Sequence, residues 1–469
     1  MPALWLLLTV LAGLGPAAAI GAGMTVQALA VVAVLSAVLT ALCSWRVAVY
    51  GLLLYVPLSG LPALVLYEHR AVVALLKDVL FVGPAYLGFT VSVLSRRVPP
   101  TAPGLPIVPF AALAVLVGIQ VFNPALPNRL AGLIGLKLWL GYVPLYLLGY
   151  HLVRDAAGAA RVFRLVALTA LLPAAVGVVQ AVLLASGHAD LVYRLYGPSA
   201  AAVTQGFAAF QVGDGLLRRV PGALPFVTQF FLFLAASIAL AEGWRQTLPR
   251  RCRGARLTAE MVCLGLLLAC FLTGARLAFV FSPLLVILLR LCVGGGALRA
   301  LGTCAGTMLA AVALLGVEVG ALVHHLFEVA QAELRFVVLE GFVRAWSVGW
   351  LGLGAGADAT AARYAFPDPA LWRAVDGVWY EGWFVRAWLE LGVVGLALVL
   401  IGYGAVVAAL ARRYRHVSEA RSRALSGAVL ALLIWALLTG VKGQTLDLDP
   451  LNMYFWLFAG VATRVAEGG

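Results

Sequence analysis

Charge is scarce in this chain of 469 residues: Asp, Glu, Lys and Arg together make up 11% of it, whereas 63% is hydrophobic. Its mean hydropathy is +1.01, and a water-soluble chain of this length needs far more polar surface. The short alternating segments of a membrane β-barrel are missing as well. Instead, apolar runs of about 18–25 residues recur from end to end, each long enough to cross a bilayer. We therefore predict an all-α polytopic membrane protein.

We expect about 12–14 transmembrane helices in the chain. The apolar runs place crossings near residues 3–21, 25–43, 47–67, 71–94, 105–122, 130–151, 162–186, 223–242, 258–274, 277–293, 299–321, 382–410, 424–441 and 449–465. Residues 1–23 end in small residues, as a signal peptide does, but they lack a basic first segment, which favours a first helix. The third run contains Pro57, Gly60 and Pro62, which are residues that break helices.

Basic residues predict the orientation of the helices. They gather in alternate connections, at Arg96, Arg97, Arg154, Arg161, Arg164, Arg245, Arg250, Arg251, Arg253, Arg256, Arg290, Arg299, Arg412, Arg413, Arg415, Arg421 and Arg423. The positive-inside rule assigns these connections to the cytoplasm. Both termini then lie inside, which agrees with an even number of helices. The net charge of +13 records this topology and is weak support for a nucleic-acid partner, because no basic soluble domain is present.

Cysteine is also scarce, and none of the six cysteines falls in a predicted outer connection. Neither a disulfide framework nor the spacing of a metal site is present. We predict no metal and no cofactor.

Two predicted outer connections are long, residues 187–222 and residues 322–381. Long loops in compact proteins tend to be functional or disordered. The second divides the chain into helices of residues 1–321, the large outer loop 322–381 and the helices of 382–469. Its segment HHLFEVAQAELRFVVLEGFVRAW predicts one or two amphipathic helices on the membrane surface. The apolar residues at helical spacing are Leu326, Val329, Ala330, Leu334, Val337, Val338 and Phe342.

The next segment, GWLGLGAGADATAARY, is rich in glycine, and its glycines predict tight turns. It is not a dinucleotide-binding fingerprint, because no strand precedes it and no acidic partner for a ribose follows in a βαβ unit.

Arginine on the outer side runs against the positive-inside trend. The outer basic residues are Arg218, Arg219, Arg276, Arg335, Arg344, Arg363, Arg373 and Lys442. Guanidinium groups pair with phosphate or carboxylate through two hydrogen bonds at once, so a cluster of them predicts an anionic ligand. The alternative for each is contact with lipid headgroups or a local acid. Arg276 lies in LTGARLAF between two apolar segments, where a charge needs a partner or a polar cavity.

Charges also mark the start of the run 382–410. Glu381 lies at its outer end, which makes it a candidate acid or base, and the alternative is a carboxylate that caps the helix. Arg386 and Glu390 share a helix face and form a pair that is mostly structural, whereas Glu381 is on a different face. Other charges in or beside apolar runs are Lys77, Asp78, Lys137, Asp447 and Asp449. The adjacent Lys77 and Asp78 point about 100° apart on a helix and could belong to an ion path.

Several motifs in a fixed order are similar to those of the O-antigen ligase and polymerase superfamily, that is, Wzy-type polysaccharide polymerases and WaaL-type O-antigen ligases. They are Lys77–Asp78, Asn123–Pro124 before the helix with Lys137, Arg219–Gly222 (RVPG), Thr273–Arg276 (TGAR), GLGAG at the end of the large loop and Leu389–Leu396 (LELGVVGL). The resemblance covers most of the chain. It implies a fold like that of class C glycosyltransferases.

The resemblance also implies glycosyl transfer at the periplasmic face of the bacterial inner (cytoplasmic) membrane. The donor would be a glycan on undecaprenyl diphosphate, and the acceptor a second lipid-linked glycan or lipid A-core. Arg219 and Arg276 match the family's outer arginines and would hold the diphosphate, with Arg218, Arg335 and Arg344 as further candidates. Inverting transfer needs a base for the acceptor hydroxyl but no metal.

Where the ligases carry a His-Asn pair, this chain has Tyr380-Glu381. We therefore expect a polymerase or an unusual relative rather than a ligase, with Glu381 as the base or as a group that orients the acceptor. His324 or His325 could instead supply the missing histidine. The alternative class is a transporter or flippase of an anionic or lipid-linked substrate. That class would show inverted repeats and charges at the membrane midplane, and no repeat is visible in the sequence.

Overall fold

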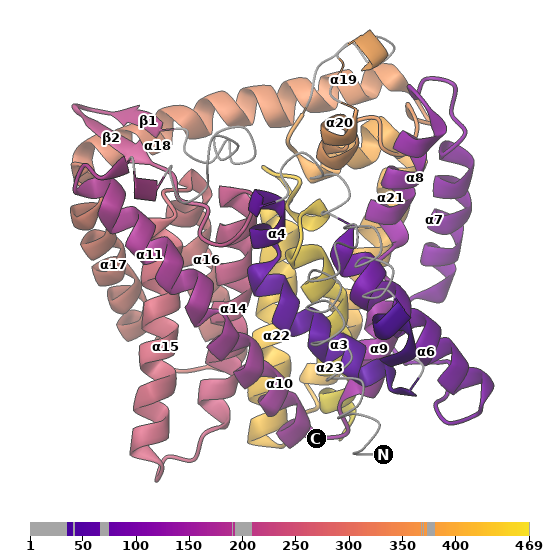
Figure 1. Ribbon diagram of the computed structural model, residues 1–469, viewed down its shortest axis with the longest axis horizontal. Coiled ribbons are helices and arrows are strands. Elements are labelled where there is room, and N and C mark those ends of the chain that lie inside the picture. Colours follow the sequence, from indigo (N-terminus) through magenta and orange to yellow (C-terminus); the bar gives the residue numbers. More distant parts are fainter. Residues whose placement is uncertain are drawn as a thin grey trace, which may run out of the picture. The chain divides into compact units, whose positions relative to one another are not determined.

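The computed structural model describes residues 35–40, 43–65, 75–189, 191–192, 209–366, 368, 370–372 and 380–468, and Figure 1 shows its elements. The chain divides into two compact units, Met1–Thr101 and Ala102–Gly469. The predicted crossing 3–21 lies outside the described residues. So do most of the crossing 25–43 and the first residues of the crossing 71–94.

The first unit contains short apolar helices. Its described elements are α3 (Trp45–Tyr55), η1 (Val56–Leu58), α4 (Gly60–Val65), η3 (Asp78–Val82) and α6 (Gly83–Leu94). The break expected near Pro57 is present, because the 3₁₀ turn η1 separates α3 from α4. Lys77 and Asp78 form an ion pair with each other, with Nζ and Oδ2 3.2 Å apart. Asp78 is the first residue of the π-helical η3.

The second unit is a bundle of long apolar helices. They are α7 (Ile107–Gln120), α8 (Arg129–Leu140), α9 (Leu145–Leu152), α10 (Ala156–Thr169), α11 (Leu171–Ala185), α14 (Val227–Thr247), α15 (Arg253–Leu272), α16 (Arg276–Val293), α17 (Ala297–Leu314), α21 (Trp383–Tyr414), α22 (Ala420–Thr439) and α23 (Leu451–Gly468). In the described part of the chain, eight helical segments are long and apolar enough to cross a membrane, with α8–α9 and α10–α11 each counted as one. The chain is an all-α, multi-pass membrane protein.

The centre of the bundle consists of α14, α22 and α23, which are buried along nearly their whole length. They carry apolar residues all round, which is the pattern of a fully enclosed helix. By contrast, α17 is mostly exposed. The predicted crossings agree closely with these helices, and the total of fourteen stays a prediction.

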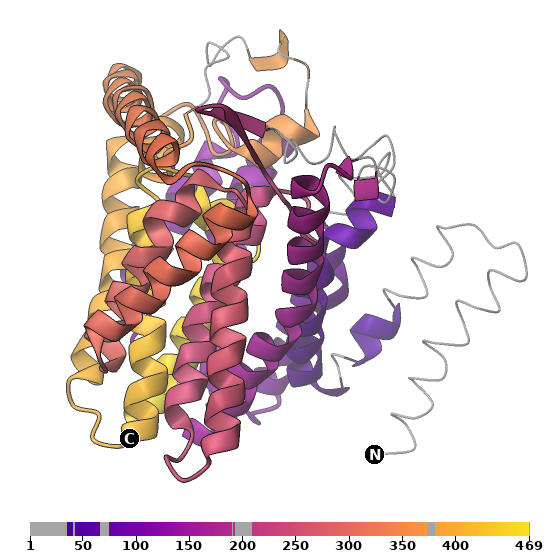
Figure 2. The same ribbon diagram turned by 90° about the vertical axis from the view of Figure 1, so that its left-hand side faces the viewer.

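One long helical rod crosses an end of this bundle (Figures 1 and 2). It consists of α18 (Val319–Glu333), the π-helical η5 (Leu334–Glu340) and α19 (Gly341–Val348). We call this the capped end of the second unit. The opposite end carries Arg250, Arg251 and Arg253 where α14 is joined to α15, and we call it the arginine-rich end. The predicted amphipathic helix is confirmed: Val337 is buried, and Leu326, Val329, Val338 and Phe342 are half-buried.

The inner face of the rod differs from the predicted one at two positions. Ala330, in α18, and Leu334, the first residue of η5, are exposed. Beyond Leu334 the π-helical winding brings Val337 and Gly341 to the inward face. The outward face carries exposed apolar side chains, among them Phe327, Val343 and Trp346. Such a face suits the boundary between lipid headgroups and acyl chains.

A short β-hairpin interrupts the otherwise helical chain. Strands β1 (Ala209–Val212) and β2 (Gly215–Arg218) pair antiparallel across a two-residue turn, with Val212 opposite Gly215. These are the only strands within the described residues. The hairpin occupies the last part of the long connection 187–222, of which residues 193–208 lie outside the described residues. The large loop also contains the short helix α20 (Thr360–Ala365).

Candidate active site

Two of the sequence motifs, RVPG and TGAR, contact each other at the capped end. The amide of Val220 donates to the carbonyl oxygen of Thr273 at 2.9 Å. Gly274 has φ of +63° and packs so closely on the backbone of Arg218 that a Cβ would collide with it. Gly222 is fixed by a pair of hydrogen bonds with the side-chain amide of Gln180, at 3.0 and 3.1 Å. The tight turn before α16 is thereby held against the segment after β2.

This contact brings Arg219 and Arg276 to the same aromatic ring. Their guanidinium carbons lie 5.5 and 4.4 Å from the centre of Phe210, on β1. The Nε atom of Arg219 is buried and has no hydrogen-bond partner among the residues that the structure describes. Burial lowers the pKa of the Arg219 guanidinium, the charge of Arg276 lowers that pKa further, and Glu381 opposes both effects. The positive charge of Arg219 is thus poorly compensated, which is the state of a group that gains by binding an anion.

A chain of ion pairs connects Arg276 with Glu381. Arg276 Nη2 lies 3.3 Å from Glu333 Oε1, Lys442 Nζ lies 3.2 Å from the same oxygen, and Lys442 Nζ lies 2.6 Å from Glu381 Oε2. We call Arg219, Arg276, Glu333, Glu381 and Lys442 the charge cluster. Three cations and two carboxylates leave it with a net charge of +1. Its five members come from five segments that are far apart in the sequence.

The carboxylate of Glu381 does not cap α21, which was the alternative to a chemical role. The N-cap of α21 is Gly382, and no side-chain cap hydrogen bond is present there. Glu381 instead pairs with Lys442 and keeps 49% of its side-chain surface exposed. The group is therefore reachable from solvent and paired with a single lysine.

The other predicted arginines that the structure describes lie outside the charge cluster. Arg218 is the last residue of β2. Arg335 has 82% of its side chain exposed and lies 3.7 Å from Glu340. Arg344 donates to Ser347 at 3.2 Å and lines a small cavity beside Tyr380. Arg373 lies outside the described residues.

The two histidines considered as replacements have different surroundings. His324 is exposed and lies 3.5 Å from Glu328 on the same helix. His325 is half-buried, and its ring centre is 6.3 Å from that of Phe210, the ring that carries both arginines. His325 is therefore the nearer of the two to the charge cluster.

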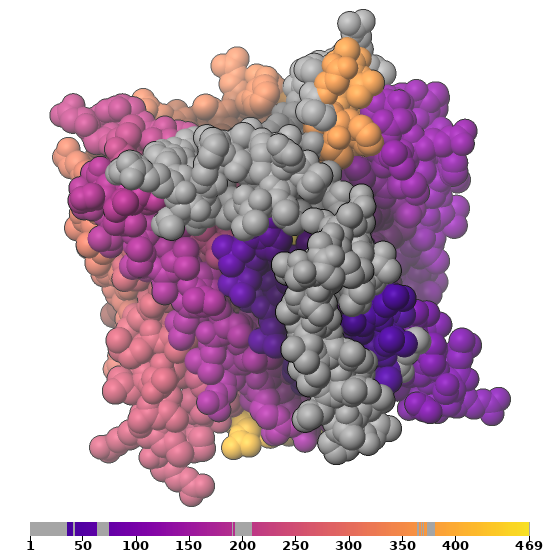
Figure 3. Space-filling model, in the orientation of Figure 1, coloured from indigo at the N-terminus to yellow at the C-terminus, as the bar shows by residue number. Residues whose placement is uncertain are grey.

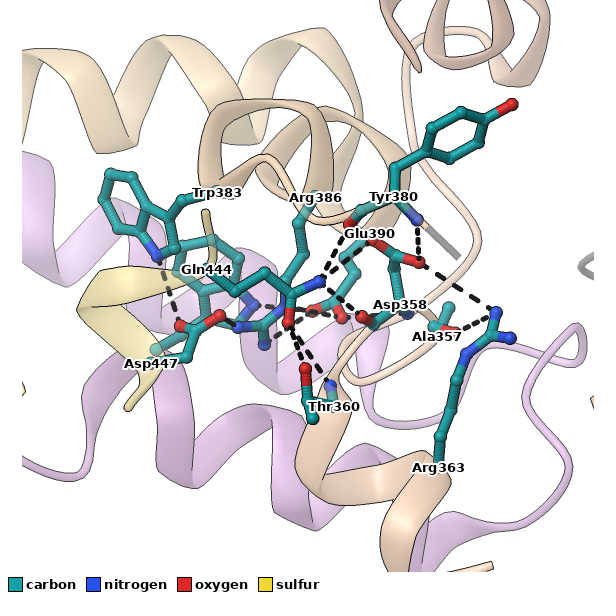
Figure 4. Close-up of polar contacts among 11 residues, drawn as sticks. Ala357, Asp358, Thr360, Arg363, Tyr380, Trp383, Arg386, Glu390, Gln444 and Asp447 are labelled. Carbon is teal, nitrogen blue, oxygen red and sulfur yellow. Dashed lines mark hydrogen bonds and ion pairs between the residues drawn. The ribbon is translucent and has the colours of Figure 1, made fainter. Parts of the chain in front are cut away.

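A second polar group, which is buried, lies within the start of α21 (Figure 4). The predicted Arg386–Glu390 pair is confirmed, with Nε and Oε1 2.9 Å apart and neither side chain exposed. Arg386 also pairs with Asp447 of η7 (Thr445–Asp447), and the indole of Trp383 donates to Asp447 at 3.1 Å. The indole of Trp139 donates to Glu390 at 2.8 Å. This group connects α8, α21 and the segment before α23.

Asp358 extends this buried group toward the large loop. Its carboxylate accepts the Tyr380 amide and the Gln444 side chain, each at 3.3 Å, and lies 3.9 Å from Arg363 Nη2. Burial raises the pKa of Asp358 well above its usual value, and the charge of Glu390 raises it further. The cavity beside Asp358 measures about 10 Å³, the space of one water molecule. No sugar could reach Asp358 without rearrangement, so we assign it a structural role.

The glycine-rich segment of the large loop packs against a break in α21. Gly392, inside α21, has φ of +71°. The amides of Leu353 and Gly354 donate to the carbonyl oxygens of Leu389 and Glu390 at 2.7 and 3.1 Å, which satisfies groups that the break releases. Gly352 also has positive φ, and a Cβ there would collide with the backbone of Glu390. These glycines therefore allow the backbone of the loop to pack closely on α21. The sequence predicted tight turns here but not this packing.

The sequence did not predict the roles of Glu333, Asp358 and Gln444. Glu333 could not be identified from the sequence, because the amphipathic segment contains several acidic residues. It differs from them only in its place on the inner face of the rod. Asp358 and Gln444 come together through the fold. The one feature of the sequence that could have indicated Asp358 is the presence of a carboxylate within a glycine-rich segment.

Comparison with known protein families found no family model that matches the chain, and no curated protein matches it. Its function is therefore inferred from its own residues.

Proposed function

We propose that the chain is a membrane glycosyltransferase that transfers a glycan from a lipid diphosphate, with the charge cluster as the diphosphate site. The observation that carries the proposal is the convergence of Arg219, Arg276 and Lys442 around Glu381 at one end of the bundle. A guanidinium with an unpartnered nitrogen beside an accessible carboxylate offers both an anion site and a base.

The chemistry requires two things of these residues. As the bond between the sugar C1 and the diphosphate oxygen breaks, negative charge grows on the diphosphate, and the three cations stabilise it. The acceptor hydroxyl attacks C1 from the opposite face while Glu381 takes its proton, so the configuration at C1 is inverted. A diphosphate that pairs with Lys442 also releases Glu381 from its 2.6 Å ion pair. Donor binding thus frees the base.

The donor class that we propose is a glycan on undecaprenyl diphosphate, and the acceptor a second lipid-linked glycan. Tyr380-Glu381 in place of the His-Asn pair of the ligases favours polymerisation over transfer to lipid A-core. We place the protein in the bacterial inner membrane with the capped end toward the periplasm, because the arginine-rich end then lies in the cytoplasm.

The test is a transfer assay with purified protein and an undecaprenyl-diphosphate-linked oligosaccharide, with products separated on a gel. We expect a ladder from the donor alone, and a rate lower by about 10²–10⁴-fold in Glu381→Gln. The matched control is Glu328→Gln, an exposed glutamate of α18 outside the charge cluster. Product only after lipid A-core is added would make the protein a ligase. An unchanged rate in Glu381→Gln would contradict the assigned base.

Transport is the second candidate, and the break in α21 beside Arg386 and Glu390 favours it, since transporters bind substrates at interrupted helices. In this chain the break is filled by residues 350–354. A transporter would move the lipid-linked glycan across a vesicle membrane without extending it, so the products of the same assay distinguish the two functions.

A further inference from the structure

A larger cavity lies at the arginine-rich end of the second unit, away from the charge cluster. It measures about 510 Å³ and lies between α14, α15, α16 and α17. Its charged lining residues are Arg245, Arg250, Arg256, Arg290, Arg299, Glu242 and Glu260. Five cations and two carboxylates give a net charge of +3. The loop 248–252 joins α14 to α15 at this end, and its residues 250–252 are exposed. This part of the second unit lies at the lower left of Figure 3.

Only part of this positive charge is neutralised within the protein. The buried Glu242 pairs with Arg245 at 2.7 Å and with Arg290 at 3.0 Å. Within the described part of the chain, the buried Nε atom of Arg290 has no hydrogen-bond partner. Arg256 and Arg299 form no ion pair with any residue that the structure describes. The lining therefore has a surplus of guanidinium groups over carboxylates.

The interior of the cavity is apolar. Its deeper lining residues are Ile238, Leu264, Leu267, Val286 and Leu289. On α14, Ile238 precedes Arg245 by two turns, a distance of about 10 Å along the helix axis. A charged mouth and an apolar interior suit a molecule with an anionic head and a hydrocarbon tail. A free anion would use only the mouth.

We propose that this cavity binds one anionic phospholipid from the leaflet at the arginine-rich end. The phosphate lies on Arg256, Arg290 and Arg299, and an acyl chain lies along the apolar faces of α15 and α16. Guanidinium groups bind phosphate through paired charge-assisted hydrogen bonds, and basic pockets between transmembrane helices on the cytoplasmic side bind acidic headgroups. This site does not depend on the proposed transferase activity.

The test measures lipid retention by native mass spectrometry of the purified, delipidated protein. We expect wild type to retain phosphatidylglycerol and to bind phosphatidylcholine much less. In the variant Arg256→Gln/Arg299→Gln, we expect phosphatidylglycerol binding to fall on the order of tenfold. Both substitutions leave the Glu242 ion pairs intact, so the variant should fold. The control Arg251→Gln/Arg253→Gln removes the same charge from exposed residues that do not line the cavity, and should bind like wild type.

Three results would overturn the proposal. The first is equal loss of binding in the two double variants, which would indicate general attraction to a basic surface. The second is equal retention of phosphatidylglycerol and phosphatidylcholine by wild type. The third is full displacement of the lipid by millimolar inorganic phosphate, which would make the ligand a free anion.

A variant of the interior tests the acyl chain separately. Leu264→Trp narrows the apolar part of the cavity and leaves every arginine in place. We expect it to bind phosphatidylglycerol more weakly than wild type does. Undiminished binding in this variant would show that only a headgroup is held, and the lipid assignment would fail.

Discussion

Arg219 is the residue whose surroundings best predict a role in anion binding. Its Nε atom is unpartnered, its charge is repelled by Arg276, and the backbone that carries it is fixed against the Thr273 turn. We expect Arg219→Ala to lower the transfer rate by about 10²–10³-fold, the usual loss when a donor to a developing oxyanion is removed. Initial rates of the gel assay measure it.

The control for Arg219 is Arg335→Ala, which removes an arginine that is largely exposed and lies outside the charge cluster. We expect it to react at the wild-type rate. Arg219→Lys should recover part of the lost rate, because it restores charge but not the paired geometry. Equal losses at the two arginines would mean that the effect is one of net charge, and would remove Arg219 from the site.

A second prediction for a single residue concerns Asp358 and the dependence of stability on pH. The folded chain holds a proton on this carboxyl more tightly than the unfolded chain, since burial raises its pKa. Its contribution to stability is therefore full below the ordinary Asp pKa of about 4, and is lost as pH rises toward the raised value. We expect Asp358→Asn to match wild type near pH 4 and to become relatively more stable at higher pH.

Thermal unfolding in detergent across this pH range measures the difference. Asp368→Asn, at an exposed aspartate of the same loop, should follow the wild-type curve at every pH. If Asp358→Asn also ran parallel to wild type, Asp358 would not be the buried acid that we infer.

Among the elements, the contact between the glycine-rich segment and the break in α21 leaves the least space for a side chain. Gly352 and Gly392 both have positive φ, and a Cβ at either would collide with backbone. We expect Gly352→Ala and Gly392→Ala each to destabilise the fold by about 1–3 kcal/mol. Gly404→Ala is the control, because it lies in the regular part of α21 with open space around it. It should be neutral or slightly stabilising.

Unfolding midpoints of the three glycine variants in the same detergent provide the measurement. Suppose that Gly404→Ala lowered the unfolding midpoint as much as Gly352→Ala and Gly392→Ala do. The sensitivity would then belong to the whole of α21 and not to the break at Gly392.

The elements also show what could be predicted from the sequence. Apolar runs located the long helices of the second unit, and helical spacing located the rod and the Arg386–Glu390 pair. The partner Asp447 could not be foreseen, because no local period connects it with Arg386. The hairpin was missed because its strands are only four residues long. The π-turn η5 displaced the inner face of the rod, and no residue pattern announced it.

Within the whole molecule, Arg386 connects separate parts of the chain. It is fully buried between two carboxylates, Glu390 of its own helix and Asp447 of η7. We expect Arg386→Met to destabilise the protein by about 3–5 kcal/mol, because two buried carboxylates lose their counter-charge. The triple variant Arg386→Met/Glu390→Gln/Asp447→Asn should recover much of that loss. Gel filtration and unfolding midpoints in detergent would show it.

The expected recovery distinguishes charge from packing. If the triple variant were as unstable as Arg386→Met alone, the volume of the arginine and its stacking on Trp139 would matter more than its charge. Recovery would show that the three charges stabilise one another and contribute little together.

The Arg386–Asp447 pair has a consequence for how the chain is made. Asp447 lies beyond α22, so it leaves the ribosome only after α21 and α22 have been synthesised. Until then, Arg386 has only Glu390 to neutralise it inside an apolar helix. The last segment of the chain therefore completes an ion pair begun by a much earlier one. A polypeptide that stops before residue 445 lacks the second carboxylate of this buried pair.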